Sequence, residues 1–238
     1  MTWAWVPNGA NGVLQPIDLV YGRVGAISSG GTAPVLSAGS VGKGYELTSS
    51  NGNYASTNIS DLTTLIGTAE AACLFVTQKL DSTNRNSCAF APTSAGTTAR
   101  FASHAPYSDG TTYFDFGGSS GSNRISVAGL DYSKPTAFLM SGALNGLRIV
   151  QDGVLRASSS TTVTRTADTN NILQLMDNGN NTDLQRFYAI FFWARDIQLQ
   201  EAQSLSANPW QLLNPIQQKW FFSPPAGISD TLMAQACL

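Results

Sequence analysis

Acidic side chains are the first candidates for chemistry in this chain, because hydrolysis of a glycosidic bond requires two carboxyl groups that flank the bond. The sequence contains only three glutamates, and Glu46, Glu70 and Glu201 lie far apart along the chain. The nearest approach to an alternate-position pair is Asp109 with Asp115, which do not share one short predicted strand. The carboxylates therefore predict no glycosidase site, and an enzyme with unrecognised residues is kept only as a third alternative.

Nucleophilic catalysis is equally unsupported, because it needs a nucleophile with an adjacent base. The single histidine, His104, ends a predicted strand, and we expect it to be a surface or turn residue. No Gly-x-Ser-x-Gly elbow occurs. The glycine-rich stretch 117–123 leads into a strand, so it lacks the helix N-terminus that binds phosphate and is predicted to be a hairpin loop. We therefore predict no catalytic residue, no enzyme activity and no organic cofactor.

Oxygen donors are concentrated in the stretch 177–183, which begins and ends with Asp177 and Asp183. Oxygen ligands suit Ca²⁺, so these two aspartates are the candidate metal ligands, although the stretch lacks the bidentate glutamate of an EF-hand. The alternative is a polar turn without metal. The cysteines, Cys73, Cys88 and Cys237, are odd in number and form no CxxC, so they predict neither a disulfide framework nor a zinc site.

The residues also allow a non-catalytic function, the binding of carbohydrate. It needs exposed aromatic rings, together with polar groups that bond sugar hydroxyls. Three tyrosines near predicted loops have such partners close in the sequence, and the candidate glycan-binding residues are Tyr107, Asp109, Tyr113, Asn123 and Tyr132. The alternative is that the tyrosines belong to the core.

The charge pattern excludes two classes of partner. Charged residues make up 12% of the chain, the net charge is −2, and the four lysines are scattered. Nucleic acids and anionic membranes both select clustered Lys and Arg, so we predict neither as a partner. The N-terminus lacks the basic and apolar regions of a signal peptide, and no apolar run approaches the length of about 20 residues that spans a bilayer. We expect a protein made in a cytoplasm and not exported through a cleaved signal.

Short alternating apolar stretches separated by Gly-containing turns run through the whole chain and predict an all-β fold. Asn-Gly and Asp-Gly pairs supply the positive φ values of two-residue hairpins, most clearly at Asp152-Gly153. The predicted strands are 19–24, 45–49, 54–58, 72–78, 88–91, 99–104, 112–116, 124–127, 136–143, 147–151, 155–159, 172–175 and 187–195. A short turn of helix is predicted from residue 60 or 61 to Leu65.

Near the C-terminus the pattern changes. Asp196 is a candidate cap for a helix that ends at Asn208-Pro209. We predict one sandwich domain over residues 1–210, with a strand or arm at 1–12, and an extended Pro-rich and aromatic arm at 211–238. The arm packs either on its own sandwich or on a neighbouring subunit. The candidate contact residues are Trp3, Trp5, Trp210, Trp220, Phe221 and Phe222, with burial as the alternative for the first two.

Two segments carry a resemblance to a known family. The hairpin 147–158 and the strand-and-helix segment 187–205, followed by Asn208-Pro209-Trp210, resemble laminin-G-like and pentraxin-like domains. The resemblance covers roughly residues 135–210, with weaker support back to Tyr45. It implies an antiparallel two-sheet β-sandwich of the concanavalin or laminin-G-like jelly-roll kind with one short C-terminal helix.

The stretch 106–118 is similar to central strands of phage-encoded members of this family. That similarity implies a non-catalytic bacteriophage virion protein, most simply a capsid decoration protein that contacts other virion proteins or sister subunits through its terminal segments. The alternative is a carbohydrate-binding adhesion module of a tail fibre, with a host surface glycan as partner. A shared fold does not by itself fix either function.

Overall fold

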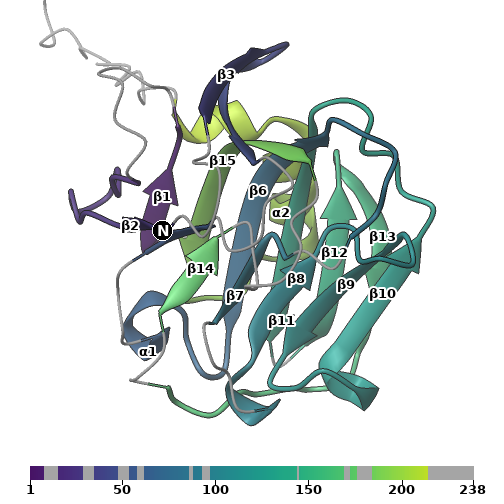
Figure 1. The fold of residues 1–238 in the computed structure, drawn as a ribbon. Coiled ribbons are helices and arrows are strands. Elements are labelled where there is room, and N and C mark those ends of the chain that lie inside the picture. The colour runs from purple at the N-terminus through teal and green to yellow at the C-terminus, as the bar shows by residue number, and fades with distance from the viewer. Residues whose placement is uncertain are drawn as a thin grey trace, which may run out of the picture.

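The computed structural model describes residues 1–7, 16–28, 35–47, 54–57, 62–85, 88–92, 97–143, 145–168, 172–175 and 184–213. Within these ranges the strands form two antiparallel sheets that face each other (Figure 1). The predicted all-β sandwich is confirmed, and the main helix, α2 (Leu199–Ala207), lies near the end of the described chain as expected.

The strand order fixes which loops meet. One sheet runs β13 (Val154–Ser158), β12 (Gly146–Gln151), β11 (Thr136–Ala143), β6 (Ala71–Lys79), β15 (Gln185–Trp193), β4 (Gly42–Leu47) and β3 (Val35–Gly39), and β1 (Trp3–Trp5) also pairs with β15. The other runs β10 (Arg124–Ala128), β9 (Thr111–Phe116), β8 (Phe101–His104), β7 (Phe90–Pro92), β14 (Leu173–Leu175), β5 (Tyr54–Ser56) and β2 (Ala26–Ser28). The short helix α1 spans Leu62–Leu65, and 3₁₀ turns span Thr97–Ala99, Gly121–Asn123 and Pro209–Leu212.

Three central strands, β6, β11 and β15, are buried on both faces, which explains their unbroken apolar sequences. Their inward residues, among them Phe75, Phe138 and Phe192, fill the space between the sheets. Their outward residues, including Leu139 and Phe191, form a second core beneath α2, which lies behind this sheet in Figure 1. Burial of this kind is the main stabilising contribution to the fold.

The β12–β13 hairpin forms at the predicted Asp152-Gly153 turn, where φ is 48° and 82°. Both turn residues therefore adopt the left-handed conformation that such hairpins need. The Asp152 carboxylate accepts a hydrogen bond of 2.8 Å from the Ala137 N–H and another from the Thr136 hydroxyl. The turn is thereby tied to the start of β11, at one end of the sandwich.

Two predictions about local structure are wrong. Residues 19–24 are not a strand but a turn region with a single bridge between Ile17 and Val24. The cause is the buried Asp18 carboxylate, which accepts the backbone N–H groups of Ala4 and Val20 and pairs with Arg23 at 2.7 Å. A carboxylate with this many donors closes the chain on itself and prevents strand pairing.

The predicted cap Asp196 is also corrected, because Gln198 is the N-cap residue of α2. Asp196 instead pairs with Arg148 of β12 at 3.0 Å and so joins the helix entry to the sheet.

Trp3 and Trp5 are assigned to the core rather than to subunit contacts. Their exposed fractions are 0% and 4%, Trp3 packs beside Phe192, and Trp5 packs edge-on against Tyr45. The burial alternative is the one the structure shows. Trp210 is half-buried and packs on the second core beneath α2. Trp220, Phe221 and Phe222 lie outside the described residues, so the arm at 211–238 stays a prediction.

Candidate functional site

Three of the five candidate glycan-binding residues meet on the β8–β9 hairpin. The Tyr113 hydroxyl donates to Asp109 at 2.8 Å, and the rings of Tyr107 and Tyr113 are 5.9 Å apart. The Arg124 guanidinium lies 4.7 Å from the centre of the Tyr113 ring. Slight desolvation raises the pKa of Asp109, but the hydrogen bonds from Tyr113 and Thr111 outweigh it and lower that pKa overall. The ring and the hydroxyl of Tyr113 are thus already engaged within the protein.

A buried ion cluster lies on the same side of this sheet. Asp115 has a fully buried side chain and is bound by Arg100 and by Arg124, each at 2.5 Å. Both guanidinium groups donate to Asp115, and that of Arg124 also lies over the Tyr113 ring, so both are engaged within the protein even though one carboxylate balances only one of the two positive charges. We name these three residues the Asp115 cluster.

His104 is not the surface or turn residue that the sequence suggested. It is 5% exposed, and its Nδ1 lies 3.4 Å from the buried Cys88 sulfur. The Arg100 guanidinium and the two tyrosine rings contact its other sides. This burial gives the histidine a packing role.

The other two candidates lie elsewhere. The Asn123 side chain packs over Gly118. Tyr132 is 5% exposed, stacks on Phe138 at 5.2 Å and hydrogen-bonds Thr112. The ring of Tyr132 is therefore part of the core, which is the alternative that the sequence left open for the tyrosines.

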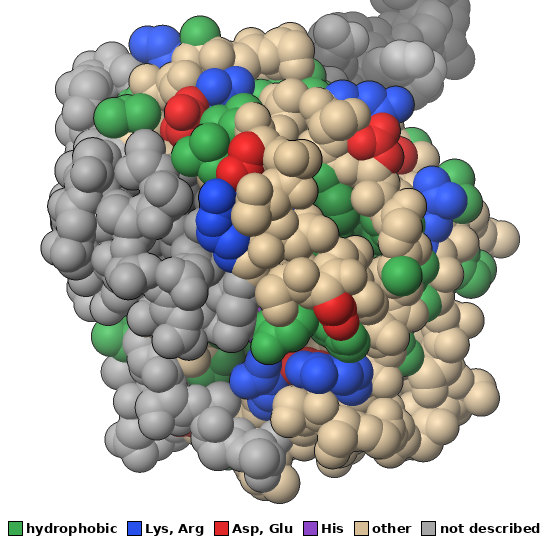
Figure 2. All heavy atoms as spheres, turned by 45° about the vertical axis from the view of Figure 1, so that its right-hand side comes forward, with side chains coloured by type: hydrophobic (Ala, Val, Ile, Leu, Met, Phe, Trp, Pro, Cys, Tyr) green, Lys and Arg blue, Asp and Glu red, His purple; other side chains and the backbone are tan. Residues whose placement is uncertain are grey.

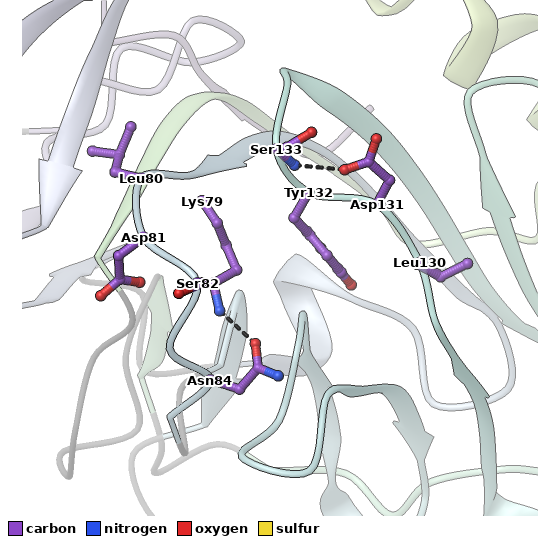
Figure 3. Close-up of a pocket in the computed structure, with 9 residues that line it drawn as sticks. All are labelled: Lys79, Leu80, Asp81, Ser82, Asn84, Leu130, Asp131, Tyr132 and Ser133. Atoms are coloured by element: carbon purple, nitrogen blue, oxygen red, sulfur yellow. Dashed lines mark hydrogen bonds between the residues drawn. The ribbon is translucent and has the colours of Figure 1, made fainter.

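Tyr132 nevertheless lines a cavity of about 480 Å³ at one end of the sandwich (Figure 3). The cavity lies between the chain that leaves β6 and the chain that enters β11. Its lining residues are Lys79, Leu80, Asp81, Ser82, Asn84, Leu130, Asp131, Tyr132 and Ser133. This volume is within the range of small-molecule sites.

The two walls of this cavity are held by local contacts. The Lys79 N–H donates to the Tyr132 carbonyl at 2.9 Å, which joins the walls. The Lys79 ammonium donates to the Thr83 carbonyl at 2.7 Å and to the Asn84 side-chain oxygen, toward which it points in Figure 3. These contacts position the loop 80–84 before any ligand arrives.

Asp131 is the most available carboxylate of the cavity. It is exposed, and one of its oxygens accepts the Ser133 N–H at 2.8 Å. Hydrogen bonds from the side chain and backbone of Ser133, with the charge of Lys134, lower the pKa of Asp131. The other carboxylate, Asp81, is paired with Arg85 at 2.9 Å. Asp131 is therefore ionised at neutral pH and able to accept hydrogen bonds.

A second cavity of about 220 Å³ adjoins the first, since Leu130 and Asp131 line both. Its remaining lining residues are Gly129, Lys134, Gln151, Asp152 and Arg156. Gln151 is buried and donates to the Asp131 carbonyl at 3.2 Å and to the Thr136 hydroxyl at 3.1 Å. We name the two cavities together the rim groove.

Sequence reasoning identified Tyr132 but missed the rest of the rim groove. Lys79, Asn84 and Asp131 lie in or beside turns, and Arg156 lies on the edge strand β13. A usable signal was present, because Lys79 is a polar residue at the end of the buried strand β6, and Asp131 lies in the polar segment before the buried strand β11. What the sequence did not provide was the strand order that brings these turns together.

Within the described ranges no group of three or more His, Cys, Asp and Glu side chains is placed to hold a metal ion. Asp177 and Asp183 lie outside these ranges, so the calcium site stays a prediction. No helix among the described residues is long and apolar enough to cross a membrane. On the face shown in Figure 2, charged side chains are scattered among uncharged surface.

Solved structures share this fold at low sequence identity. Domain 4 of AbnA, a GH43 extracellular arabinanase from Geobacillus stearothermophilus, in complex with arabinotriose, has a TM-score of 0.62 at 15% identity and covers 86% of this chain and 97% of its own. The binding domain of botulinum neurotoxin DC, in complex with rat synaptotagmin II, has a TM-score of 0.62 at 10% identity over 85% of this chain. The Trypanosoma rangeli sialidase in complex with sialic acid has a TM-score of 0.60 at 10% identity over 87% of this chain.

The chain spans 50% of the botulinum binding domain and 32% of the sialidase. No family model matches the sequence, and no curated protein matches it. At these identities the likeness establishes the β-sandwich fold alone.

Proposed function

We propose that this β-sandwich is a carbohydrate-binding module that holds its ligand in the rim groove. The observation that carries the proposal is the lining of the larger cavity, which places two carboxylates, an amide, an ammonium and two serine hydroxyls around one space. Sugars present many hydroxyls that both donate and accept hydrogen bonds. A site with donors and acceptors on opposite walls suits such a ligand.

The positions of the groups support this proposal. Asp131 is held by Ser133 and has lone pairs left for sugar hydroxyls. The side-chain oxygen of Asn84 accepts a hydrogen bond from Lys79, so the N–H₂ group of the same amide is the part that can donate to a ligand. Leu80 and Leu130 add apolar surface for the C–H groups of a sugar ring. Since the loop contacts already exist without a ligand, little ordering cost would be paid on binding.

The similar structures provide independent support for the class of ligand. Two of these structures are complexes with a carbohydrate, arabinotriose for the arabinanase domain and sialic acid for the sialidase. The botulinum domain is described with a protein, synaptotagmin II. A protein ligand is therefore the outcome against which the proposal is tested.

We further propose that binding is not followed by catalysis. Glu46 pairs with Arg186 at 2.7 Å, and Glu201 pairs with Arg195 at 2.5 Å. Glu70 accepts the Asp196 N–H at 3.2 Å. Each glutamate thus has a partner of its own, and none lines the rim groove. Of the three aspartates that line it, Asp81 pairs with Arg85, and both oxygens of Asp152 accept hydrogen bonds from the start of β11. Among the described lining residues this leaves Asp131 without a second available carboxylate, whereas glycoside hydrolysis needs a pair.

Retention on immobilised neutral and acidic oligosaccharides tests the function. Asp131→Ala should lower the affinity for the retained sugar about tenfold or more, the loss expected for a hydrogen bond to a charged group. Asp109→Ala, which removes an exposed carboxylate from the tyrosine hairpin, is the matched control and should bind like the wild type. Retention of no sugar would contradict the function, and an effect confined to Asp109→Ala would move the site to the hairpin.

The virion role stays a prediction, because neither the described residues nor the similar structures bear on it. A phage particle could carry a module of this kind, so the two ideas are compatible.

A further inference from the structure

One arginine of this chain differs from the others. Seven of the nine arginines, 23, 85, 100, 124, 148, 186 and 195, form ion pairs with aspartate or glutamate. Arg165 is buried and donates to backbone carbonyls, including those of Leu62, Ile66 and Gly67. Within the described ranges, Arg156 has neither kind of partner, and its side chain is exposed on the edge strand β13.

Arg156 lines the smaller cavity of the rim groove together with Lys134. Lys134 is also exposed and forms no ion pair within 4 Å among the described residues. The cavity therefore contains two cationic side chains in a protein that has few charges and pairs nearly all of its arginines.

The acidic residues of this cavity are engaged in other ways. Both Asp152 oxygens accept hydrogen bonds from the start of β11, one from Thr136 and one from Ala137. Asp131 lies at the boundary with the larger cavity, bonded to Ser133. Neither carboxylate makes a direct ion pair with the arginine or the lysine.

We propose that the rim groove selects sugars that carry a carboxylate, the uronic acids, and that Arg156 and Lys134 bind this group. A guanidinium presents two parallel N–H donors that match the two oxygens of a carboxylate. Lys134 adds a second positive charge beside it. Asp131 and Asn84 then bind the hydroxyls of the neighbouring sugar in the larger cavity, so the ligand is an oligosaccharide that extends across both.

Two other anionic ligands fit less well. Nucleic acid requires a row of cations along its phosphates, whereas only two cations of this groove, Lys134 and Arg156, have no hydrogen-bond or ion-pair partner among the described residues, in a chain of net charge −2. A single free phosphate would leave the hydrogen-bond donors and acceptors of the larger cavity without a ligand partner. The inference rests on the proposed function, because it names the class of sugar that the same groove binds.

The test compares one polymer with and without its charge, namely oligogalacturonate and its fully methyl-esterified form, by calorimetry at low and moderate salt. We expect the acid to bind about ten- to a hundredfold more tightly than the ester, the range for charge-assisted hydrogen bonds. The preference should shrink as salt is added. Lys134→Gln/Arg156→Gln should remove it, whereas Lys43→Gln, which neutralises an exposed lysine of β4, should not.

The outcomes separate the inference from the function. Equal affinity for acid and ester, or a preference unchanged in the double variant, overturns the uronic-acid inference and leaves sugar binding intact. Retention of neutral but not of acidic sugars on the oligosaccharide panel likewise overturns the uronic-acid inference and leaves sugar binding intact. Retention of no sugar at all overturns both. Circular dichroism of the double variant should match the wild type, since neither side chain forms a hydrogen bond or an ion pair with another described residue.

Discussion

The Asp115 cluster and the rim groove both collect charged side chains on this sandwich, yet they differ in how those charges are satisfied. In the Asp115 cluster one fully buried carboxylate accepts hydrogen bonds from two arginines, so both guanidinium groups have an internal partner. In the rim groove, Asp131, Lys134 and Arg156 are exposed and retain unused donors and acceptors. The comparison indicates that a concentration of charge is a candidate binding site only where internal partners are missing.

The two regions also differ in energetic role. Removing one partner from a buried pair leaves an uncompensated charge in the interior, which is costly. Exposed charges contribute little to stability, because water already solvates them. Substitutions in the first region should therefore change unfolding, and those in the second should change binding.

The largest effect is expected for Asp115→Ala. Two guanidinium groups would lose their buried partner, so we expect a loss of about 3–5 kcal/mol in the free energy of unfolding. Urea unfolding followed by tryptophan fluorescence measures it. Sugar affinity should not change while the protein stays folded. A loss below about 1 kcal/mol would mean that the cluster is not the stabilising region that its burial indicates.

An intermediate effect is expected for Lys79→Met, because Lys79 is buried and also lines the rim groove. Its ammonium holds the Thr83 carbonyl and the Asn84 side chain, so its removal should cost about 1–3 kcal/mol in stability. It should also weaken sugar binding, since the loop 80–84 loses its anchor. Lys43→Met serves as the control in both assays. A change in stability without a change in affinity would remove the loop from the site.

The smallest effect is expected for Tyr113→Phe, and it is a change in titration. The hydrogen bond from the Tyr113 hydroxyl helps to lower the pKa of Asp109. A depressed folded-state pKa gives stability that is present above the unfolded pKa of about 3.9 and is lost as pH falls through the folded value. In the variant, the Asp109 pKa should rise toward 3.9, as followed by carboxyl NMR titration. An unchanged pKa would show that Thr111 alone stabilises the ionised form.

Local features of the fold could be predicted from the sequence. The strand at Thr136–Ala143 was predicted with its observed bounds, because an apolar run there lies between Pro135 and the Asn145-Gly146 turn. The β12–β13 hairpin followed from its Asp-Gly turn. By contrast, β2 and β3 were not predicted, since their stretch is rich in Gly, Ser and Ala and shows little alternation.

The candidate site likewise has a part that the sequence could predict and a part that it could not. Tyr107, Asp109 and Tyr113 were correctly associated because they lie on one hairpin, where closeness in sequence implies closeness in space. Asn84, Asp131 and Arg156 converge only because β6 pairs with β11 and β11 pairs with β12, which pairs with β13. The burial of Tyr132 and His104 likewise depends on which sheet covers them. None of these long-range relations appears in a local pattern.

The central claim is that the rim groove, rather than the tyrosine hairpin, holds the ligand. Titration of ¹⁵N-labelled protein with an oligosaccharide retained on the panel tests it most directly, through the backbone amides whose chemical shifts move. We predict shifts concentrated at residues 79–85, 129–134 and 151–156. Shifts concentrated at residues 107–113, with the groove unchanged, would contradict the account.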